Sequence, residues 1–170
     1  MPHRFLPFIP LDRLKEVQAS NDMNEYYDLL CQPLHEELYR RQDFSFFEEL
    51  TDGQQMMICY DYVQNHVLQG GFIQLIQNGY VNMLAPMPGW LATIGDEQMA
   101  KLIDDVLKVY VINRDILDKE TTPEEFANLY EQLPVFGPLD KRFESLHPYT
   151  VELMLQYATH HIDEFAKVIG

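Results

Sequence analysis

Two adjacent histidines followed by two acids have the residue types of a metal site. His160 and His161 precede Asp163 and Glu164. On a helix, this spacing places His160 and Asp163 on one face, and His161 and Glu164 on a neighbouring face. The alternative is a set of solvated polar residues near a helix end. We favour that alternative and expect no metal, while a metal-dependent enzyme remains one alternative function.

Two further strings begin like metal motifs and do not complete them. Glu144 and His147 form a Glu-x-x-His string, which di-iron bundles need twice, but here it occurs once and runs into Pro148. The segment from His35 to Tyr39 begins like a zinc-protease helix but has tyrosine where the second histidine ligand belongs. We therefore expect no cofactor.

Nucleophile arrangements are equally incomplete. The sequence has no Gly-x-Ser-x-Gly elbow, no P-loop and no Gly-x-Gly-x-x-Gly string. Cys59 lies in the apolar stretch Met57–Tyr60, which is typical of a buried thiol. Asp104 and Asp105 are consecutive helix positions and point about 100° apart, so they make a poor acid/base pair. No catalytic residue is expected, and the protein is interpreted as a non-enzyme.

Charge is the extreme feature of the sequence. There are 12 Lys and Arg against 27 Asp and Glu, which gives a formal net charge of −15. No Lys or Arg occurs from Gln42 through Ala100, and Glu16 to Tyr39 holds six acids and no base. Such a surface repels nucleic acid and anionic membranes and attracts basic protein surfaces. Acidity that serves only solubility is the simpler alternative.

The acids recur at helical spacing, which places neighbouring carboxylates about 5–6 Å apart. Duplex DNA carries one phosphate per about 3.4 Å of axis on each strand, so a helix studded this way approximates a row of phosphates. An ordinary solvated helix face has the same spacing. The candidate partner-binding acids are Asp22, Glu25, Asp28, Glu36, Glu37, Asp43, Glu48, Glu49, Asp52, Asp115, Asp118, Glu124 and Glu125.

The elements that must position these acids are predicted to be helices. The 170 residues suit one domain, 46% of them are apolar, and no run is long enough to span a bilayer. The proline-interrupted start lacks the pattern of a signal peptide, and Cys31 and Cys59 resemble buried free thiols of a reducing compartment. We expect a cytoplasmic, all-α, compact single-domain bundle of about seven to nine helices over residues 1–170.

Helical periodicity sets the expected boundaries. Helices are predicted for Met23–Arg41 (started anew or kinked at Pro33), Gln54–Gln69 (capped by Asp52, stopped at Gly70-Gly71), Phe72–Gln77, Asp96 to about Arg114, a Thr122-Pro123-Glu124-Glu125 capping box through Gln132, Leu139–Leu146, and Pro148 to about Val168. Asn82–Trp90 is predicted as a loop, and no strand is expected. The predicted core includes Met56, Tyr60, Val63, Val67, Phe72, Leu133, Phe136, Leu139 and Phe143.

Two stretches resemble a known bacterial family. The segment from Gln69 through Gly79 (QGGFIQLIQNG) is similar to the "GGF-hydrophobic-Asn" signature of the acidic DNA-mimic protein family. Leu129–Leu133, followed by Phe136–Asp140 and Phe143, resembles its second signature, in which a helix leads to a "Leu-Asp-x-x-Phe" turn. The resembling region covers about residues 52–165. The resemblance implies an all-α fold, frequent dimerisation, and in at least one branch a role as a mimic of double-stranded DNA.

The leading hypothesis is therefore a non-enzymatic acidic binding protein, a DNA mimic that occupies the DNA-binding surface of a basic partner such as a transcriptional regulator. It would bind no nucleic acid and no membrane directly, and it would form a homodimer. The runner-up is a protein-interaction or immunity-type module that uses an apolar surface, for example around Trp90. We predict that the acids of Asp22–Glu37 and Asp43–Asp52 form one contiguous negative face, which would favour the first hypothesis.

Overall fold

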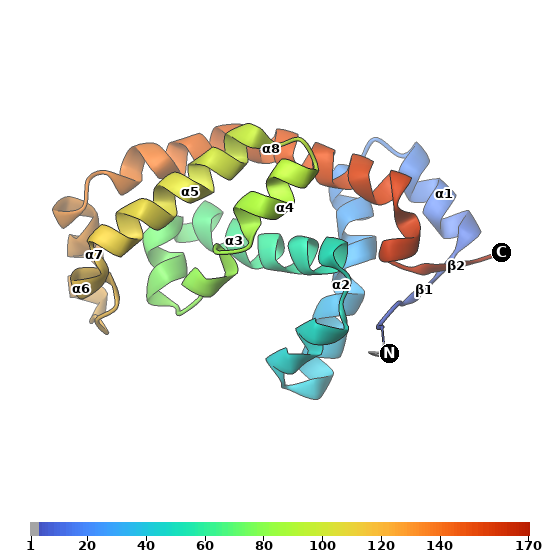
Figure 1. Ribbon diagram of the computed structural model, residues 1–170, viewed down its shortest axis with the longest axis horizontal. Coiled ribbons are helices and arrows are strands. Elements are labelled where there is room, and N and C mark those ends of the chain that lie inside the picture. Colours follow the sequence, from blue (N-terminus) through green and yellow to red (C-terminus); the bar gives the residue numbers. More distant parts are fainter. Residues whose placement is uncertain (1–3) are drawn as a thin grey trace. The chain divides into compact units, whose positions relative to one another are not determined.

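Helices dominate the structure, a computed structural model that describes residues 4–170 (Figure 1). Within this range there are eight α-helices, and the predicted all-α fold class is confirmed. The α-helices are α1 (Leu11–Ala19), α2 (Met23–Arg41), α3 (Asp52–Gln77), α4 (Met87–Thr93), α5 (Glu97–Ile112), α6 (Arg114–Leu117), α7 (Pro123–Gln132) and α8 (Phe136–His160). The 3₁₀ helices are η1 (Phe44–Glu49), η2 (Val81–Met83) and η3 (Ile162–Glu164), and the strands are β1 (Phe8–Pro10) and β2 (Lys167–Ile169).

The chain divides into two compact units. Unit 1 contains residues 4–58 and 151–170 of the described chain, and unit 2 contains residues 59–150. The boundary falls within α3 and within α8. The single-domain organisation expected from the sequence stays a prediction.

Unit 1 is built around α2, whose two ends are defined by local chemistry. Asp22 caps the first turn, because its Oδ1 accepts the backbone N–H groups of Asn24 and Glu25. Gln42, at φ 53°, turns the chain into the left-handed region after Arg41. The predicted span is confirmed, and α2 continues past Pro33 as one helix.

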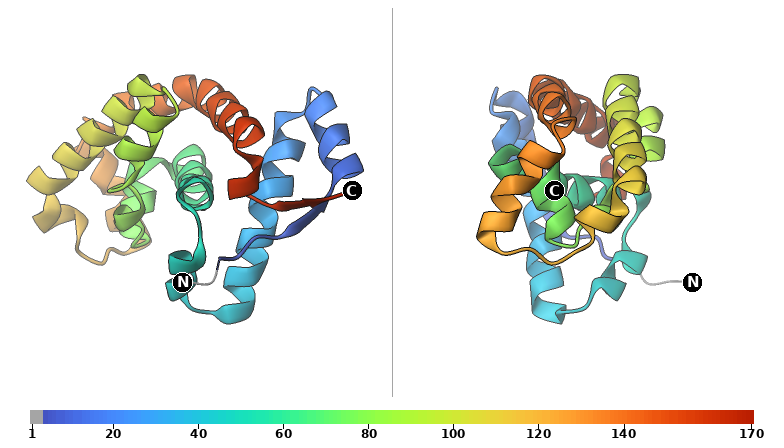
Figure 2. Two further views of the ribbon diagram at one scale, coloured as in Figure 1. Left: turned by 45° about the vertical axis from the view of Figure 1, so that its right-hand side comes forward. Right: turned by 90° about the vertical axis from the view of Figure 1, so that its left-hand side faces the viewer.

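A short parallel strand pair in unit 1 was not expected from the sequence. β1 pairs with β2 in the register Phe8 to Lys167, and Figure 2 shows the two strands side by side next to α1. The predicted last helix was wrong beyond residue 160, since α8 ends at His160 and is followed by η3 and β2. Three-residue strands are too short to show an alternating pattern, and the pairing joins segments far apart in sequence.

The first turn of α3 corrects the predicted cap. The residue before the helix, Thr51, provides the cap: its Oγ1 accepts the N–H of Gln54 at 3.2 Å, while Gln54 Oε1 accepts the N–H of Thr51 at 2.9 Å. This reciprocal pair is a capping box with glutamine in place of glutamate. Asp52 is therefore the first helical residue and does not cap the helix.

The predicted break at Gly70-Gly71 is present inside α3. Gly71 has φ 79° and ψ 179°, a backbone conformation open essentially only to glycine, so two helical segments meet there at a kink. A Cβ at Gly71 would lie 2.1 Å from Tyr130 Oη and 2.3 Å from Asp140 Oδ2. Glycine is required at this position by both the backbone and its neighbours.

Prolines mark helix starts in unit 2 where the sequence analysis expected a loop. Residues 82–90 hold η2 and the start of α4, with Pro86 at the N-cap and Pro88 in the first turn. A first-turn proline loses no helical hydrogen bond, and this explains why the loop prediction was wrong. Trp90 therefore lies on α4, partly exposed.

The expected separation of Leu139–Leu146 from a helix at Pro148 was also wrong, because α8 runs through Pro148. An interior proline removes one backbone hydrogen bond. The carbonyl left without its helical partner is that of Glu144. Both Glu144 and Pro148 are exposed, so water can solvate this carbonyl. The start of α8 at Phe136 likewise places Gly137 and Pro138 in its first turn, three residues before the start predicted at Leu139.

The core prediction is confirmed. All nine side chains predicted to be buried have 8% or less of their surface exposed. Cys31 and Cys59 are buried and neither forms a disulfide within the described residues, as expected, and burial raises the pKa of Cys59 to about 12. A thiol with so high a pKa is protonated at neutral pH and is a poor nucleophile.

Candidate functional site

Nine of the thirteen candidate acids belong to unit 1. Asp22 caps α2, Glu25, Asp28, Glu36 and Glu37 lie on α2, Asp43 caps η1, Glu48 and Glu49 lie on η1, and Asp52 begins α3. Six of them are exposed, and Glu25, Glu37 and Glu49 are partly exposed. The local sequence therefore places these carboxylates at the surface of the unit.

Arginines pair with the three partly exposed acids. Arg13 donates to Glu25 at 2.9 Å, and Arg41 Nε donates to Glu37 at 2.8 Å while its other nitrogens reach Glu49. Hydrogen bonds from Arg40 and Arg41 lower the pKa of Glu37 to about 2. Arg41 directly precedes the stretch from Gln42 through Ala100 that holds no Lys or Arg, and it pairs with Glu49 inside that stretch.

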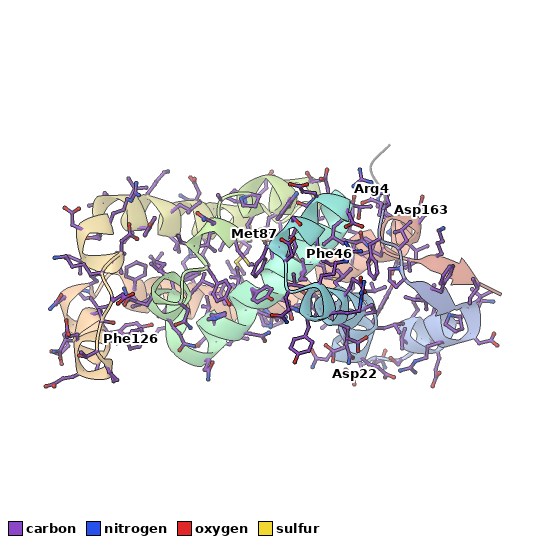
Figure 3. The ribbon with its side chains drawn as sticks, turned by 90° about the horizontal axis from the view of Figure 1, so that it is seen from below. Arg4, Asp22, Phe46, Met87, Phe126 and Asp163 are labelled. Carbon is purple, nitrogen blue, oxygen red and sulfur yellow. The ribbon has the colours of Figure 1, made fainter. Side chains whose placement is uncertain are left out.

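Two acids are fixed in place by backbone hydrogen bonds. Asp22 holds the first turn of α2, as described above. Asp43 accepts the N–H of Ser45 at 2.9 Å, and this hydrogen bond lowers the pKa of Asp43. Figure 3 shows Asp22 at one edge of unit 1 and Asp163, another exposed acid, at the opposite edge. Negative charge is thus present on more than one side of this unit.

The other four candidate acids lie in unit 2. Asp118 accepts a hydrogen bond from Tyr110 Oη at 2.6 Å and lies 3.5 Å from Arg114 Nε. Glu125 completes the predicted capping box with Thr122, which is confirmed. Asp115 and Glu124 are exposed. The structure thus assigns nine acids to one unit and four to the other.

Unit 2 also connects the two glycine- and aspartate-containing stretches singled out in the sequence. Asp140, near the start of α8, accepts the N–H of Phe72 at 2.9 Å, directly after the kink at Gly71. Tyr130 Oη donates to the carbonyl of Gly70. Burial raises the pKa of Asp140 and moves that of Tyr130 well above its usual value. Asp140 and Tyr130 thus hold the kink of α3 in place.

Comparison with known families shows which family the chain belongs to. The family model of DMP19-like proteins matches residues 48–161, which is more than half of the sequence. The chain belongs to the DMP19-like family. A search of curated proteins gives no match.

The DMP19-like region holds only part of the candidate acidic surface. Its seven members are Glu48, Glu49, Asp52, Asp115, Asp118, Glu124 and Glu125. The other six acids, from Asp22 to Asp43, precede the matched region. The kink of α3 and its contacts with Tyr130 and Asp140 all lie inside the DMP19-like region, as the two sequence signatures do.

The histidines weighed as metal ligands contact a backbone carbonyl and neighbouring side chains. The helix ends at His160, so the predicted placement of all four residues on one helix was wrong. His160 Nδ1 lies 2.7 Å from the carbonyl of Gln156, and His161 Nδ1 lies 3.8 Å from Glu164. His147 Nδ1 lies 2.7 Å from Tyr60 Oη inside the DMP19-like region, and burial lowers the pKa of His147. A neutral His147 in contact with a buried tyrosine is typical of a structural residue.

Asp96 is a buried acid whose burial was not predicted from the sequence. It is 1% exposed, accepts the N–H of Met99 at 3.1 Å as the cap of α5, and accepts a hydrogen bond from Thr150. The cap position was visible as the start of the predicted helix, but Thr150 lies 54 residues away.

Among residues 4–170, no helix combines the length and apolar character needed to cross a membrane.

Proposed function

We propose that this protein is a non-enzymatic DNA mimic that occupies the DNA-binding surface of a basic partner, such as a transcriptional regulator. It acts in the cytoplasm as a homodimer of single-domain subunits, and it binds neither nucleic acid nor membranes itself. Its binding residues are the thirteen candidate acids, nine in unit 1 and four in unit 2.

The observation that supports this proposal is the exposed acidic surface of the protein. The protein belongs to the DMP19-like family, which is a family of DNA mimics. The net charge of −15 provides long-range attraction to a basic surface. Glu36, Glu48 and Asp52 are exposed and form no ion pair with any Lys or Arg of residues 4–170. Their charges are therefore available to a partner.

Competition with DNA tests the proposal. Basic DNA-binding proteins captured from the host lysate at low salt are identified, and each is mixed with its own DNA in a mobility-shift experiment. We expect the acidic protein to release the DNA, and to do so less well as salt rises, because the attraction is electrostatic. A protein that releases no DNA from any captured partner contradicts the proposal.

A triple variant locates the effect. Glu36→Gln, Glu48→Gln and Asp52→Asn together should weaken partner binding by about 1–3 kcal/mol, since exposed charge pairs contribute up to about 1 kcal/mol each. Association should slow more than dissociation accelerates. The matched control replaces three exposed acids outside the candidate set, Glu97, Glu131 and Glu144, by glutamine. An equal loss in the control would show that net charge matters and the assigned residues do not.

A second function, an interaction module with an apolar surface, is favoured by one observation. Val111 is 63% exposed and Ile112 is 81% exposed at the end of α5, and Ile116 in α6 is 38% exposed. Partner binding that survives several hundred millimolar salt and the triple variant, but is lost with Ile112→Ser, would support this function over mimicry.

A further inference from the structure

A surface cleft in unit 1 differs from the rest of the acidic surface because it combines charge with an apolar floor. It has a volume of about 500 Å³ and lies between the α1–α2 turn and residues 152–160 of α8. Val17, Tyr26 and Leu155, all buried, form part of its lining. Met23, 41% exposed, also lines it. The cleft therefore offers apolar contact area that a flat, solvated helix face lacks.

A chain of hydrogen bonds gives the cleft a fixed wall. Thr159 Oγ1 donates to the carbonyl of Leu155 at 2.8 Å, so its oxygen is left to accept the hydroxyl proton of Tyr26 at 2.9 Å. Gln18 Nε2 in turn donates to Tyr26 Oη at 3.0 Å. The tyrosine ring is thereby held by groups from α1 and α8, and the lining is formed before any ligand arrives.

The charges around this cleft select for a cation. Asp22 and Glu152 are exposed at its rim, together with the imidazole of His160, and none of the described residues that line it is Lys or Arg. Asp22 Oδ1 accepts the two backbone N–H groups of α2, whereas neither hydrogen bond involves Oδ2. The cleft also lies at the C-terminal end of α8, where the helix dipole favours positive charge.

We infer that this cleft takes an arginine side chain of the basic partner, an inference that rests on the proposed function. The methylene stem lies over Met23 and Leu155, and the guanidinium reaches the carboxylates of Asp22 and Glu152. Arginine fits better than lysine because its planar head is weakly hydrated and presents paired N–H donors to carboxylates. DNA-binding proteins use many such arginines to contact phosphates, so the cleft provides a specific anchor within an otherwise diffuse acidic surface.

Titration with a small probe tests the cleft directly. N-acetyl-arginine amide should shift the backbone amide signals of Asp22–Glu25 and Glu152–His160 in NMR spectra of the whole protein. N-acetyl-citrulline amide, which has nearly the same shape without the charge, should bind at least about fivefold more weakly. Equal binding of the two probes, or shifts spread over the whole protein, would overturn the inference.

Variants separate the cleft from general acidity. Asp22→Asn keeps a good helix cap, and Glu152→Gln changes only charge. Together they should weaken arginine-probe binding about five- to tenfold, whereas Asp163→Asn, at the opposite edge of unit 1 in Figure 3, should leave it unchanged. Gln156→Phe fills the cleft without altering charge and should also weaken binding. Thermal unfolding confirms that each variant is folded, and an equal effect of Asp163→Asn would refute the cleft.

The same variants in the DNA-release experiment distinguish this inference from the proposed function. A protein that releases DNA from its partner equally well with Asp22→Asn/Glu152→Gln and with Gln156→Phe is a mimic that does not use the cleft. If the protein selects the arginine probe but releases no DNA from its partner, the inference about the cleft stands and the proposed mimic function fails.

Discussion

The two units carry nearly equal net charge but use their acids differently. Unit 1 has six Lys and Arg against fourteen Asp and Glu, and unit 2 has six against thirteen. In unit 2, Asp96 is buried and Asp140 is partly buried, and each accepts a backbone N–H that fixes a helix start or a kink. In unit 1, the nine candidate acids all reach the surface.

This difference shows why a charge count does not define a binding surface. An acid that caps a helix inside the fold contributes to stability, and its burial reduces its electrostatic attraction to a partner. Substitutions of the interior groups of unit 2 should therefore change stability, whereas substitutions of the exposed acids in unit 1 should change binding. The following predictions test that division.

The largest effect is expected at the kink of α3. Gly71→Ala should destabilise the fold by at least about 3 kcal/mol, because a side chain is strained at φ 79° and its Cβ would collide with Tyr130 and Asp140. Urea unfolding monitored by circular dichroism measures the loss. Gly89→Ala is the control: it lies in α4 with no atom within 4 Å of an added Cβ, and it should be neutral or stabilising by about 0.5 kcal/mol. Similar losses at both positions would contradict this account of the kink.

A smaller effect is expected at the buried cap of α5. Asp96→Ala removes the acceptor of Met99 N–H and leaves the buried hydroxyl of Thr150 without this partner. The expected loss is about 2 kcal/mol, since caps and buried unsatisfied groups each cost about 1 kcal/mol or more. The neighbouring exposed Glu97→Ala is the control and should cost less than about 0.5 kcal/mol. A loss at Asp96 no larger than this would show that its burial has no structural role.

The smallest effect, and one that depends on pH, is expected in unit 1. Hydrogen bonds from Arg40 and Arg41 lower the pKa of Glu37 from 4.5 to about 2. The ionised group is thus stabilised in the folded state, so its contribution is present above about pH 4.5 and is lost as the pH falls towards 2. Glu37→Gln should cost less than about 1 kcal/mol at pH 7, and the difference from the parent protein should shrink across that window.

Urea unfolding at a series of pH values measures this difference. Glu131→Gln, an exposed acid of α7, is the control, and its difference from the parent should stay near zero throughout. If the difference in unfolding free energy between Glu37→Gln and the parent protein is constant from pH 7 to pH 2, the arginine pairs do not stabilise the folded state.

Periodicity and caps were enough to predict much of the fold. The span of α2, the capping box at Thr122 and the buried face from Met56 to Val67 follow from local rules that tertiary contacts did not override. Pro86 and Pro148 were misinterpreted because a proline marks a helix start, an interior position or a loop according to its surroundings. Thr51 was missed as a cap because the neighbouring Asp52 is also a preferred cap residue.

For the candidate site, the sequence locates the acids but not their partners. That Glu49 pairs with Arg41 depends on how η1 turns back towards α2. The cleft lined by Met23 and Leu155 depends on contacts between residues more than 100 positions apart. Neither feature leaves a signal in spacing or composition.

The pairing of β1 with β2 has a consequence for the order of folding. The family-matched region, residues 48–161, lies wholly between the two strands in sequence. Closing so long a loop has an entropic cost that few hydrogen bonds offset, whereas the helices form from local contacts. The strands should therefore join late in folding and separate early in unfolding, so that unit 1 opens first at this pair.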